Sequence, residues 1–330
     1  MKVNIFYRKK NVNQYSIERV YNTLIPFLLP NTSVKVKEMP FVSKGIIKRF
    51  LNILYASINQ SDINHISGDI NYVNFFIKKK STILTIHDIY PLHRNFGFKK
   101  KLLNLFWFKI PIRRANIITT VSEFSKAEIL NEFKIPNEKI LVINNCVSPL
   151  CKPSDKEFNK ESPNILHIGT KENKNLNHLI EALKGLNTKL IIVGKLTTVQ
   201  KNKLNSYKIN FDNFKAISDV LLFQLYEECD ILSFISLYEG FGLPIIEAQA
   251  IGRVVITSNV SSMPEIAGKG AYFVDPYSEM SIKNGIKKLI SNSDLRNKLI
   301  NYGFENIKKY QPEKIAKQYL EVYNKILDEK

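Results

Sequence analysis

The sequence predicts an α/β fold made of two doubly wound domains, each with a parallel sheet between helices. Two observations lead to this prediction. Strand-like and helix-like segments alternate along both halves of the chain, and a charged stretch with three prolines, residues 148–163, separates the halves. Strands that alternate with helices and lack tight hairpin turns form parallel sheets. A chain of 330 residues is also long for one hydrophobic core and suits two domains.

In the first half, short apolar runs alternate with segments of helical periodicity. A helix is predicted at residues 17–29, where apolar residues recur every three or four positions. A second helix follows Ser122, whose hydroxyl can cap it, and runs to Phe133. Strands are predicted at residues 2–7, 62–66, 82–86, 117–121 and 139–143.

In the second half the same alternation restarts after the proline-containing stretch. Helices are predicted at residues 176–186 and 243–251, and the chain reads as helical from residue 278 onward. A break at 310–312 contains a proline that can open a new helix. Strands are predicted at residues 164–168, 189–193, 230–236, 254–257 and 271–274.

The composition is that of a soluble globular protein, with 44% hydrophobic and 24% charged residues. No run of eighteen apolar residues is present, and from the order of apolar and charged residues at 1–10 we expect no signal peptide. Three cysteines without a CxxC pair indicate neither a disulfide framework nor a zinc site, and favour the cytoplasm. The net charge of +18 fits an anionic partner such as phosphate, an acidic membrane or nucleic acid, or equally a drift in composition toward lysine.

A loop with two acids and two glycines is the strongest candidate for a site. In open α/β sheets, ligands bind outside the carboxyl ends of the strands. Gly240 and Gly242 let a backbone approach a ligand, and the helix start behind them favours negative charge. Glu239 stands on the loop, and Glu247 is one turn into the helix, where it can accept two vicinal hydroxyls. The alternative is an ordinary capped helix with a surface acid.

The segment EGFGLPIIEA, with Glu239 and Glu247 eight positions apart, resembles the signature of retaining glycosyltransferases of family 4, which share the GT-B fold. Four other segments resemble parts of that family in the same order along the chain. They are Ile165–Thr170 followed by Lys174-Asn175-Leu176, the TVSEFS segment at 119–125, the histidine loop at 85–88 and the SSMPE loop at 261–265. The resemblance runs from about residue 62 to 275. It implies two Rossmann-like domains facing across a cleft.

The resemblance also implies a role for each matching residue. Glu239 would contact the donor sugar, Glu247 would hold the ribose, and Lys174 would neutralise the departing diphosphate. The catalytic residues implied are Glu239, His87 and Lys174. The donor-binding residues implied are Gly169, Thr170, Lys171, Gly240, Phe241, Gly242, Leu243 and Glu247. No metal and no other cofactor is implied, and the domains would be 1–150 with the final helix at about 312–330, and 151–311.

Three departures from the family pattern bear on these roles. Many relatives have arginine where this chain has Thr170, although Lys171 can supply the charge. The family's NGVD motif is Asn145–Ser148 here, and no contact is assigned to it. The loop at residues 11–16 lacks the two glycines that many relatives place beside the donor.

Two histidines are candidates for the acceptor side. His87 follows a strand and precedes Asp88, which could orient its ring. His65 ends a strand and could line the acceptor pocket, or could instead be satisfied by neighbouring groups in the core. His167 lies within a strand and is expected in the core. No pair of histidines at helical spacing suggests a metal site.

Two basic segments mix aliphatic and aromatic residues, at 44–55 (KGIIKRFLNILY) and 96–114 (FGFKKKLLNLFWFKIPIRR). They are candidates for an amphipathic surface that rests on an anionic membrane, where a lipid-linked acceptor would wait. The alternative is a pair of soluble helices with solvated basic faces. No motif for nucleic-acid binding is present.

The sequence therefore predicts transfer of a hexose from a nucleoside diphosphate donor to a glycan or lipid-linked acceptor in the synthesis of cell-surface polysaccharide. Mannose is the first choice, because the SSMPE loop resembles that of mannosyl-transferring relatives. The predicted location is the cytoplasm or the inner face of the plasma membrane. Two other classes stay open, a non-catalytic nucleotide-sugar or glycan-binding protein on the same fold and a basic nucleic-acid-binding protein.

Overall fold

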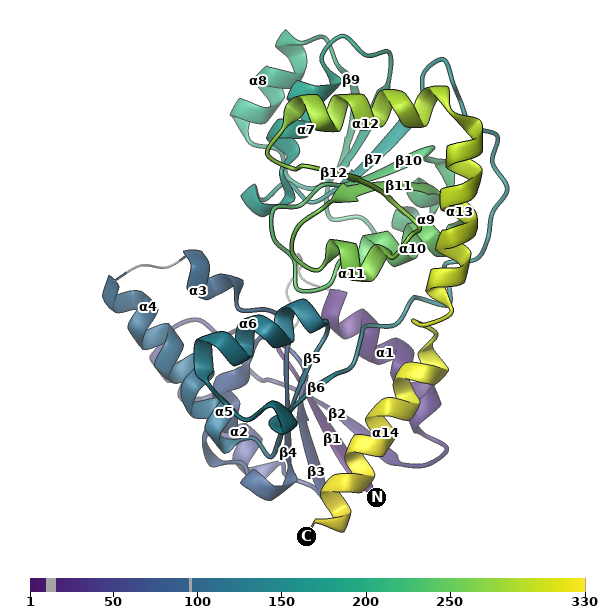
Figure 1. Ribbon diagram of the computed structural model, residues 1–330. Helices are drawn as coiled ribbons and strands as arrows, with labels where there is room; N and C mark the ends of the chain where they lie inside the picture. Colours follow the sequence, from purple (N-terminus) through teal and green to yellow (C-terminus); the bar gives the residue numbers. More distant parts are fainter. Residues whose placement is uncertain (10–15, 95–96, 330) are drawn as a thin grey trace. The chain divides into compact units, whose positions relative to one another are not determined.

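The computed structural model describes residues 1–9, 16–94 and 97–329, which form two units (Figure 1). Unit 1 comprises Met1–Cys146 and Gln311–Lys330, and unit 2 comprises Val147–Tyr310. The last helix, α14 (Pro312–Asp328), therefore belongs to unit 1 although it follows unit 2 in the sequence. Of the loop predicted at 11–16, residues 11–15 lie outside the described residues.

Among its described residues, unit 1 has a sheet of six parallel strands in the order β2-β1-β3-β4-β5-β6. The strands are β1 (Lys2–Tyr7), β2 (Ser33–Glu38), β3 (Ile63–Ile66), β4 (Thr82–Ile86), β5 (Ile117–Thr120) and β6 (Ile140–Val142). The helices besides α14 are α1 (Ser16–Leu28), α2 (Ile46–Ile58), η1 (Asn71–Phe76), η2 (Lys79–Ser81), α3 (Tyr90–Arg94), α4 (Gly97–Leu103), the π-helical η3 (Asn104–Lys109), α5 (Ile110–Arg114), α6 (Glu123–Phe133) and η4 (Asn137–Lys139).

One face of the unit 1 sheet is apolar and the other carries polar side chains. Both can occur on the same strands because successive side chains of a strand point to opposite sides. On one face, buried apolar residues pack with α2, η1, η3 and α5. On the other, Tyr323 of α14 bonds to His65 Nδ1 at 2.9 Å, and Thr85 bonds to His65 Nε2 at 2.7 Å. The hydroxyl of Tyr21 in α1 lies 3.0 Å from both Thr85 Oγ1 and the Tyr319 hydroxyl. These polar contacts attach α1 and α14 to the sheet.

Unit 2 repeats this architecture, with six parallel strands in the order β12-β11-β10-β7-β8-β9 among its described residues. Helix α12 packs against α7, and α10 packs against α13, in two layers separated by the sheet (Figure 1). The strands are β7 (Asn164–Ile168), β8 (Lys189–Val193), β9 (Asn210–Phe214), β10 (Ile231–Phe234), β11 (Val254–Ser258) and β12 (Tyr272–Val274). The helices are η5 (Glu172–Lys174), α7 (Leu176–Leu183), α8 (Thr198–Ser206), α9 (Asp219–Glu228), α10 (Leu243–Ile251), α11 (Met263–Ala267), α12 (Glu279–Ser291) and α13 (Ser293–Ile307).

The strand order of each sheet reverses once. In unit 1 the chain proceeds outward on either side of the β1–β3 pair, and in unit 2 on either side of the β7–β10 pair. At such a point the loops at the carboxyl ends diverge to opposite faces and leave a crevice where ligands bind. The topology therefore predicts that ligands bind at the loops after β7 and β10, and at those after β1 and β3.

The predicted α/β fold is confirmed, with two corrections to the predicted elements. Strands β2 and β9 and helices α8, α9 and α11 were not predicted. The helical segment predicted from residue 278 is also interrupted earlier than at the predicted break, at Asn292 between α12 and α13. Asn292 has extended dihedral angles, and its side chain accepts a hydrogen bond from Leu295 N at 2.9 Å, which caps α13. The predicted cap at Ser122 is confirmed by a 3.1 Å bond from Ser125 N.

Candidate active site

An ion pair occupies the reversal point of unit 2. Lys174, at the end of η5 after β7, places its Nζ 2.7 Å from Oε1 of Glu239 in the loop after β10. The two side chains are 22% and 16% exposed, so the pair is neither buried nor fully solvated. Asn173 donates to the same carboxylate oxygen at 3.2 Å and to the Tyr238 carbonyl. The structure thus brings together two predicted residues whose direct contact had no signal in the sequence.

The backbone around Lys174 is held in a conformation that favours particular residues. Gly169 has φ +96°, and a Cβ placed there would lie 2.8 Å from Lys174 Cγ. Asn175 has φ +63°, and its side chain donates to the carbonyls of Ile235 and Pro276 at 3.1 and 2.7 Å. The aliphatic part of the Lys174 side chain therefore lies across Gly169, and the hydrogen bonds of Asn175 hold the backbone beside Lys174 in place. Asn175 was not predicted as a site residue, although it lies in the Lys-Asn loop that led to Lys174.

Thr170 and Lys171 complete the loop after β7. The Thr170 hydroxyl donates to the Lys195 carbonyl at 2.8 Å, and its methyl group lies against Gly194, where a Cβ would be 2.8 Å away. Thr170 therefore joins the loops after β7 and β8 through contacts that an arginine side chain would not reproduce. Lys171 is exposed.

The loop after β10 is fixed by two serines of the loop after β11. Ser261 Oγ accepts from Glu239 N at 3.1 Å and donates to the Glu239 carbonyl at 2.7 Å. Ser262 Oγ donates to the carbonyls of Glu239 and Phe241 at 3.0 and 2.8 Å. These bonds hold Glu239 in place from the backbone side. The SSMPE segment, which in the sequence was only a point of family resemblance, supplies this support.

The glycine-rich turn leads directly into α10. Gly242 has φ +109° and occupies the N-cap position, and Gly240 is buried. The Phe241 side chain is buried and meets the Tyr310 ring edge-on, with centroids 5.7 Å apart. Leu243 begins the helix and is half-buried. The Phe241 side chain thus packs inside unit 2, so only the backbone of this residue can contact a ligand.

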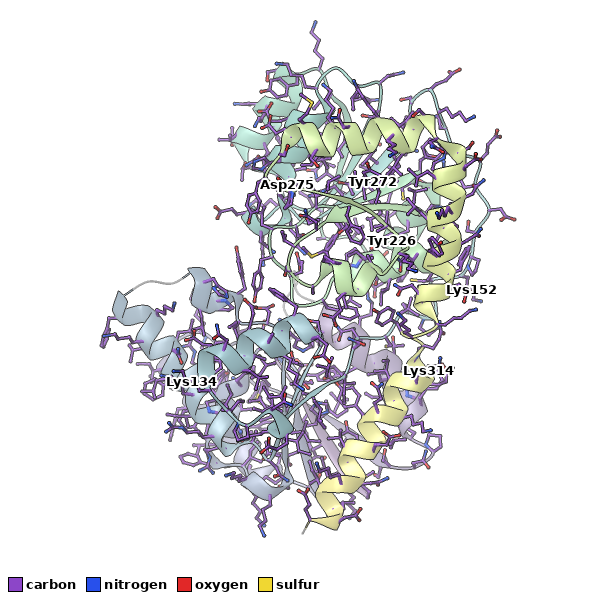
Figure 2. The ribbon with its side chains drawn as sticks, viewed as in Figure 1. Lys134, Lys152, Tyr226, Tyr272, Asp275 and Lys314 are labelled. Carbon is purple, nitrogen blue, oxygen red and sulfur yellow. The ribbon has the colours of Figure 1, made fainter. Side chains whose placement is uncertain are left out.

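Glu247 lies in α10 and is only 2% exposed. Its Oε2 accepts a hydrogen bond at 2.8 Å from the hydroxyl of Tyr226, a buried residue of α9 inside unit 2 (Figure 2). One carboxylate oxygen is therefore already engaged by the protein. Tyr226 was not predicted, since α9 itself was not recognised in the sequence.

His87 follows β4 in unit 1. Its Nε2 lies 2.7 Å from the Ser67 carbonyl, which can only accept, so the ring donates there. Burial lowers the pKa of His87, so the ring is neutral near pH 7 and Nδ1 keeps its lone pair. Among the described residues, the His87 ring bonds to Ser67 and not to Asp88, which accepts instead from Tyr90 N at 2.9 Å. The group that orients the ring is thus the Ser67 carbonyl, where the sequence suggested Asp88.

A second ion pair lies at the reversal point of unit 1. Arg8, just after β1, donates from Nε and Nη2 to the two oxygens of Glu18 at 2.7 and 3.0 Å. A longer contact of 3.4 Å joins Arg8 to Asp69, which follows β3. Both acids contribute to the electrostatic environment of His87. Sequence reasoning missed this cluster, because its members are single charged residues without a motif.

His65 is fully buried in the polar layer between the sheet and α14. Burial lowers the pKa of its ring to about 3, and both ring nitrogens have partners within unit 1. Of the two interpretations of His65 left open by the sequence, the structure therefore favours a satisfied histidine of the core over one lining an acceptor pocket.

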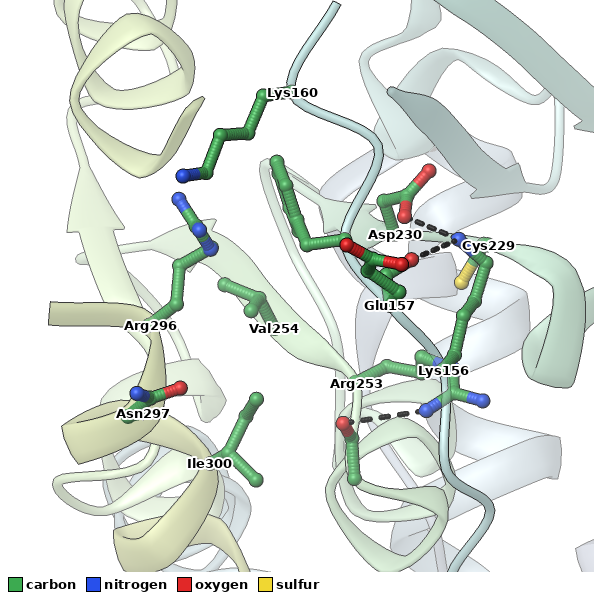
Figure 3. Close-up of a pocket in the computed structure, with 12 residues that line it drawn as sticks. Lys156, Glu157, Lys160, Cys229, Asp230, Arg253, Val254, Arg296, Asn297 and Ile300 are labelled. Atoms are coloured by element: carbon green, nitrogen blue, oxygen red, sulfur yellow. Dashed lines mark hydrogen bonds and ion pairs between the residues drawn. The ribbon is translucent and has the colours of Figure 1, made fainter. Parts of the chain in front are cut away.

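A basic cavity of about 260 Å³ lies at the amino ends of β10 and β11 (Figure 3). Three of its cations already have structural partners. Lys156 pairs with Asp230, and Arg253 donates to the carbonyls of Tyr226, Glu227 and Ser154. Arg296 bonds the carbonyls at the end of α12 and covers the Phe158 ring. The cavity lies at the opposite end of the strands from the glycine-rich turn, and its residues attach the linker and α13 to the sheet.

Two family models match the chain in succession. The model described as "Glycosyltransferase Family 4" matches residues 26–149, and the one described as "Glycosyl transferases group 1" matches residues 152–306. Together they cover most of the chain. Each match ends close to the boundary between units 1 and 2.

Curated relatives and solved structures are consistent with these matches. The O-antigen chain mannosyltransferase RfbU of Salmonella typhimurium is 28% identical over 69% of this chain and 67% of its own length. The O-antigen chain mannosyltransferase B of Escherichia coli is 28% identical over 63% of this chain and 60% of its own length. The matched region thus spans about two thirds of these relatives. Anabaena HepE, solved in complex with UDP and glucose, has a TM-score of 0.78 at 17% identity and covers 98% of this chain and 100% of its own.

Proposed function

This chain belongs to the group 1 glycosyltransferases, and we propose that it transfers a hexose, with mannose as first choice, from a nucleoside diphosphate sugar to a glycan or lipid-linked saccharide. The observation that carries the proposal is the Lys174–Glu239 pair beside the glycine-rich turn, at the reversal point of unit 2. The two relatives named as O-antigen mannosyltransferases support mannose and a place in the synthesis of cell-surface polysaccharide.

The donor-binding groups divide according to charge. We assign the sugar hydroxyls to Glu239 and the ribose to Glu247, because carboxylates accept hydrogen bonds from hydroxyl groups. The backbone of Gly240–Leu243 and the start of α10 would face the diphosphate, with Lys174 and the loop Gly169–Lys171. When donor binds, Lys174 would share its charge between Glu239 and the phosphate, and this cation would stabilise the leaving diphosphate as the bond to the sugar breaks.

We propose that the anomeric configuration is retained. The bond between C1 of the sugar and the phosphate oxygen breaks, and the acceptor oxygen bonds to C1 on the same face. The acceptor hydroxyl gives its proton to an oxygen of the departing phosphate. His87 would contact the transferred sugar as a neutral ring whose Nδ1 accepts a hydrogen bond. NMR coupling constants of the product identify its anomer.

We further propose that the reaction needs no metal ion, because Lys174 and the helix start supply the positive charge. Turnover is expected to be unchanged when the enzyme is assayed with excess chelator. We place the enzyme in the cytoplasm, at the inner face of the plasma membrane, with no nucleic acid among its partners.

The test combines donor binding with donor turnover. A panel of nucleotide-sugars is screened by thermal shift, because a ligand bound only by the folded protein raises its melting temperature. Hydrolysis or transfer of the best donor is then measured for the wild type, Glu239→Gln, and the control Glu172→Gln, an exposed acid in the neighbouring turn. Loss of one charged transition-state contact is expected to slow turnover about 100-fold or more in Glu239→Gln. Turnover unaffected by Glu239→Gln, or a wild type inactive with every donor, would refute the proposal.

A further inference from the structure

Helix α2 is apolar on the side that faces away from unit 1. Asn52 and Ala56 are buried, one turn apart, and mark the side that packs inward. Ile47, Phe50, Leu54 and Ile58, spaced three or four residues apart, are 76%, 50%, 39% and 82% exposed, and Ile46 is 84% exposed. A surface helix normally directs polar residues to solvent. This helix instead exposes a continuous apolar stripe.

The segment formed by α4 and η3 has a stripe of the same kind. Phe98 and Leu102 are 74% and 40% exposed, and Leu105 and Phe106 of the next turn are 42% and 46% exposed. Phe108 of η3 is buried and packs on the Phe133 ring, so the segment is anchored by a different side. The exposed apolar residues of α4 and η3 therefore do not take part in the packing of this segment against unit 1.

The two stripes belong to one surface of unit 1. The guanidinium group of Arg49 in α2 lies over the Trp107 ring of η3, 5.1 Å from its centroid. Helix η1 lies between them, with Tyr72 against Trp107 at 4.8 Å and Phe75 against Phe106 at 6.3 Å. Figure 1 shows α2 and α4 along the same side of the unit 1 sheet. We call the surface formed by α2, η1, α4 and η3 the basic apolar face.

The charge of the basic apolar face has one sign. No acidic residue occurs between Glu38 and Asp62, or between Asp88 and Glu123. These two segments contribute the exposed cations Lys44, Lys48, Arg49, Lys101 and Lys109. Glu132 of α6, outside these segments, accepts from Asn104 of η3 at 2.8 Å. Exposed apolar side chains among cations match a bilayer, which offers anionic headgroups and acyl chains at the same surface.

We propose that the basic apolar face docks on a lipid bilayer that contains anionic lipids, with Ile46, Ile47, Phe50 and Phe98 entering the headgroup region. The proposal rests on the proposed function in that it names the surface on which a lipid-linked acceptor is met. A second copy of the chain is a poorer occupant, since two faces of the same positive charge repel each other. A contiguous apolar surface of this kind is uncommon on a monomeric protein and marks an interaction site.

The experiment measures co-sedimentation of the full chain with vesicles of phosphatidylglycerol and phosphatidylethanolamine, and with vesicles of phosphatidylcholine alone. The test variant combines Ile46→Ser, Ile47→Ser and Phe50→Ser, whose side chains are at least half exposed. The matched control combines Val199→Ser and Val220→Ser, exposed apolar residues of unit 2. We expect the wild type and the control to bind anionic vesicles, more weakly at high salt, and the test variant to lose about tenfold or more in affinity.

Three outcomes would overturn the proposal. They are equal binding to the two kinds of vesicle, unchanged binding by the test variant, and an oligomer of the wild type that the test variant dissociates in sedimentation velocity. Donor binding by thermal shift is measured on the same proteins without vesicles. A protein that binds vesicles but no donor contradicts the proposed function alone, and one that binds donor but no vesicle contradicts this proposal alone.

Discussion

At the scale of single residues, the position of Lys174 depends on the absence of a side chain at Gly169. We expect Gly169→Ala to cost about 1–3 kcal/mol of stability, because alanine at a positive φ is strained. Its Cβ would also meet Lys174 Cγ at 2.8 Å and displace the ammonium group. Because a small misplacement of a catalytic group slows the reaction, displacement of the Lys174 ammonium group is expected to reduce kcat/KM about 10- to 100-fold.

Gly185→Ala is the matched control for this substitution. Gly185 has φ +74°, and a Cβ there meets no atom within 4 Å, so the variant has backbone strain without a steric clash. Urea denaturation is expected to show a similar loss of stability in both variants, and donor turnover a loss only in Gly169→Ala. Equal turnover of the two would mean that Gly169 acts only through the backbone.

The candidate site shows how far residue patterns reach. The types and spacing of Glu239 and Glu247 around two glycines singled them out in the sequence, and the family resemblance implied Lys174. Neither the Lys174–Glu239 pair nor the Tyr226–Glu247 bond could be predicted. Each joins residues from different elements, and only the packing of the sheet and helices determines that distance.

At the scale of elements, α14 is attached to the unit 1 sheet through a buried polar contact. Tyr323→Phe removes the hydroxyl bonded to His65 Nδ1 and leaves that nitrogen buried without a partner. We expect a loss of about 1–3 kcal/mol. The loss should appear as faster hydrogen exchange in α14 and β3. Tyr277→Phe, at a tyrosine that is 64% exposed, should change stability by less than about 0.5 kcal/mol. Unaltered exchange in Tyr323→Phe would show that apolar packing alone holds α14.

All strands inside the two sheets were predicted, and so were the edge strands β6 and β12, whereas two of the edge strands were missed. Strands β4, β7 and β8 begin and end at the predicted residues, because strands covered on both faces are continuous apolar runs. The missed strands β2 and β9 are edge strands, with the sequences SVKVKE and NFDNF. An edge strand is partly solvated and needs few apolar residues. Its strand conformation comes from pairing with a neighbour, which is a tertiary contact.

At the scale of the whole molecule, each unit contains a fully buried histidine, His65 in unit 1 and His167 in unit 2. Burial lowers the pKa of His65 in unit 1 to about 3 and that of His167 in unit 2 to about 4. An unfolded histidine has a pKa near 6.5. The folded state therefore has its full stability above about pH 6.5 and loses stability as the pH falls toward the folded values. At about pH 5 the expected loss is about 2 kcal/mol per histidine.

Hydrogen exchange at about pH 5 and pH 7.5 separates the two units, because each unit reports through its own sheet. His167→Gln should be less stable at the higher pH but show a smaller pH dependence in unit 2 alone. His93→Gln, at an exposed histidine, should leave both pH dependences unchanged. An unchanged pH dependence of unit 2 in His167→Gln would rule out this origin of acid sensitivity.

The sequence by itself determined the α/β class, the alternation of strands and helices on both sides of the linker, and the loop that contains Glu239 and Glu247. These features are local, since they follow from periodicity, capping residues and glycines within short windows. Only the tertiary structure decided that His65 is a core residue, that Tyr323 bonds α14 to it, and that the segments around Arg49 and Trp107 form one face. These features depend on contacts between residues far apart in the chain, and such contacts cannot be predicted from short windows of sequence.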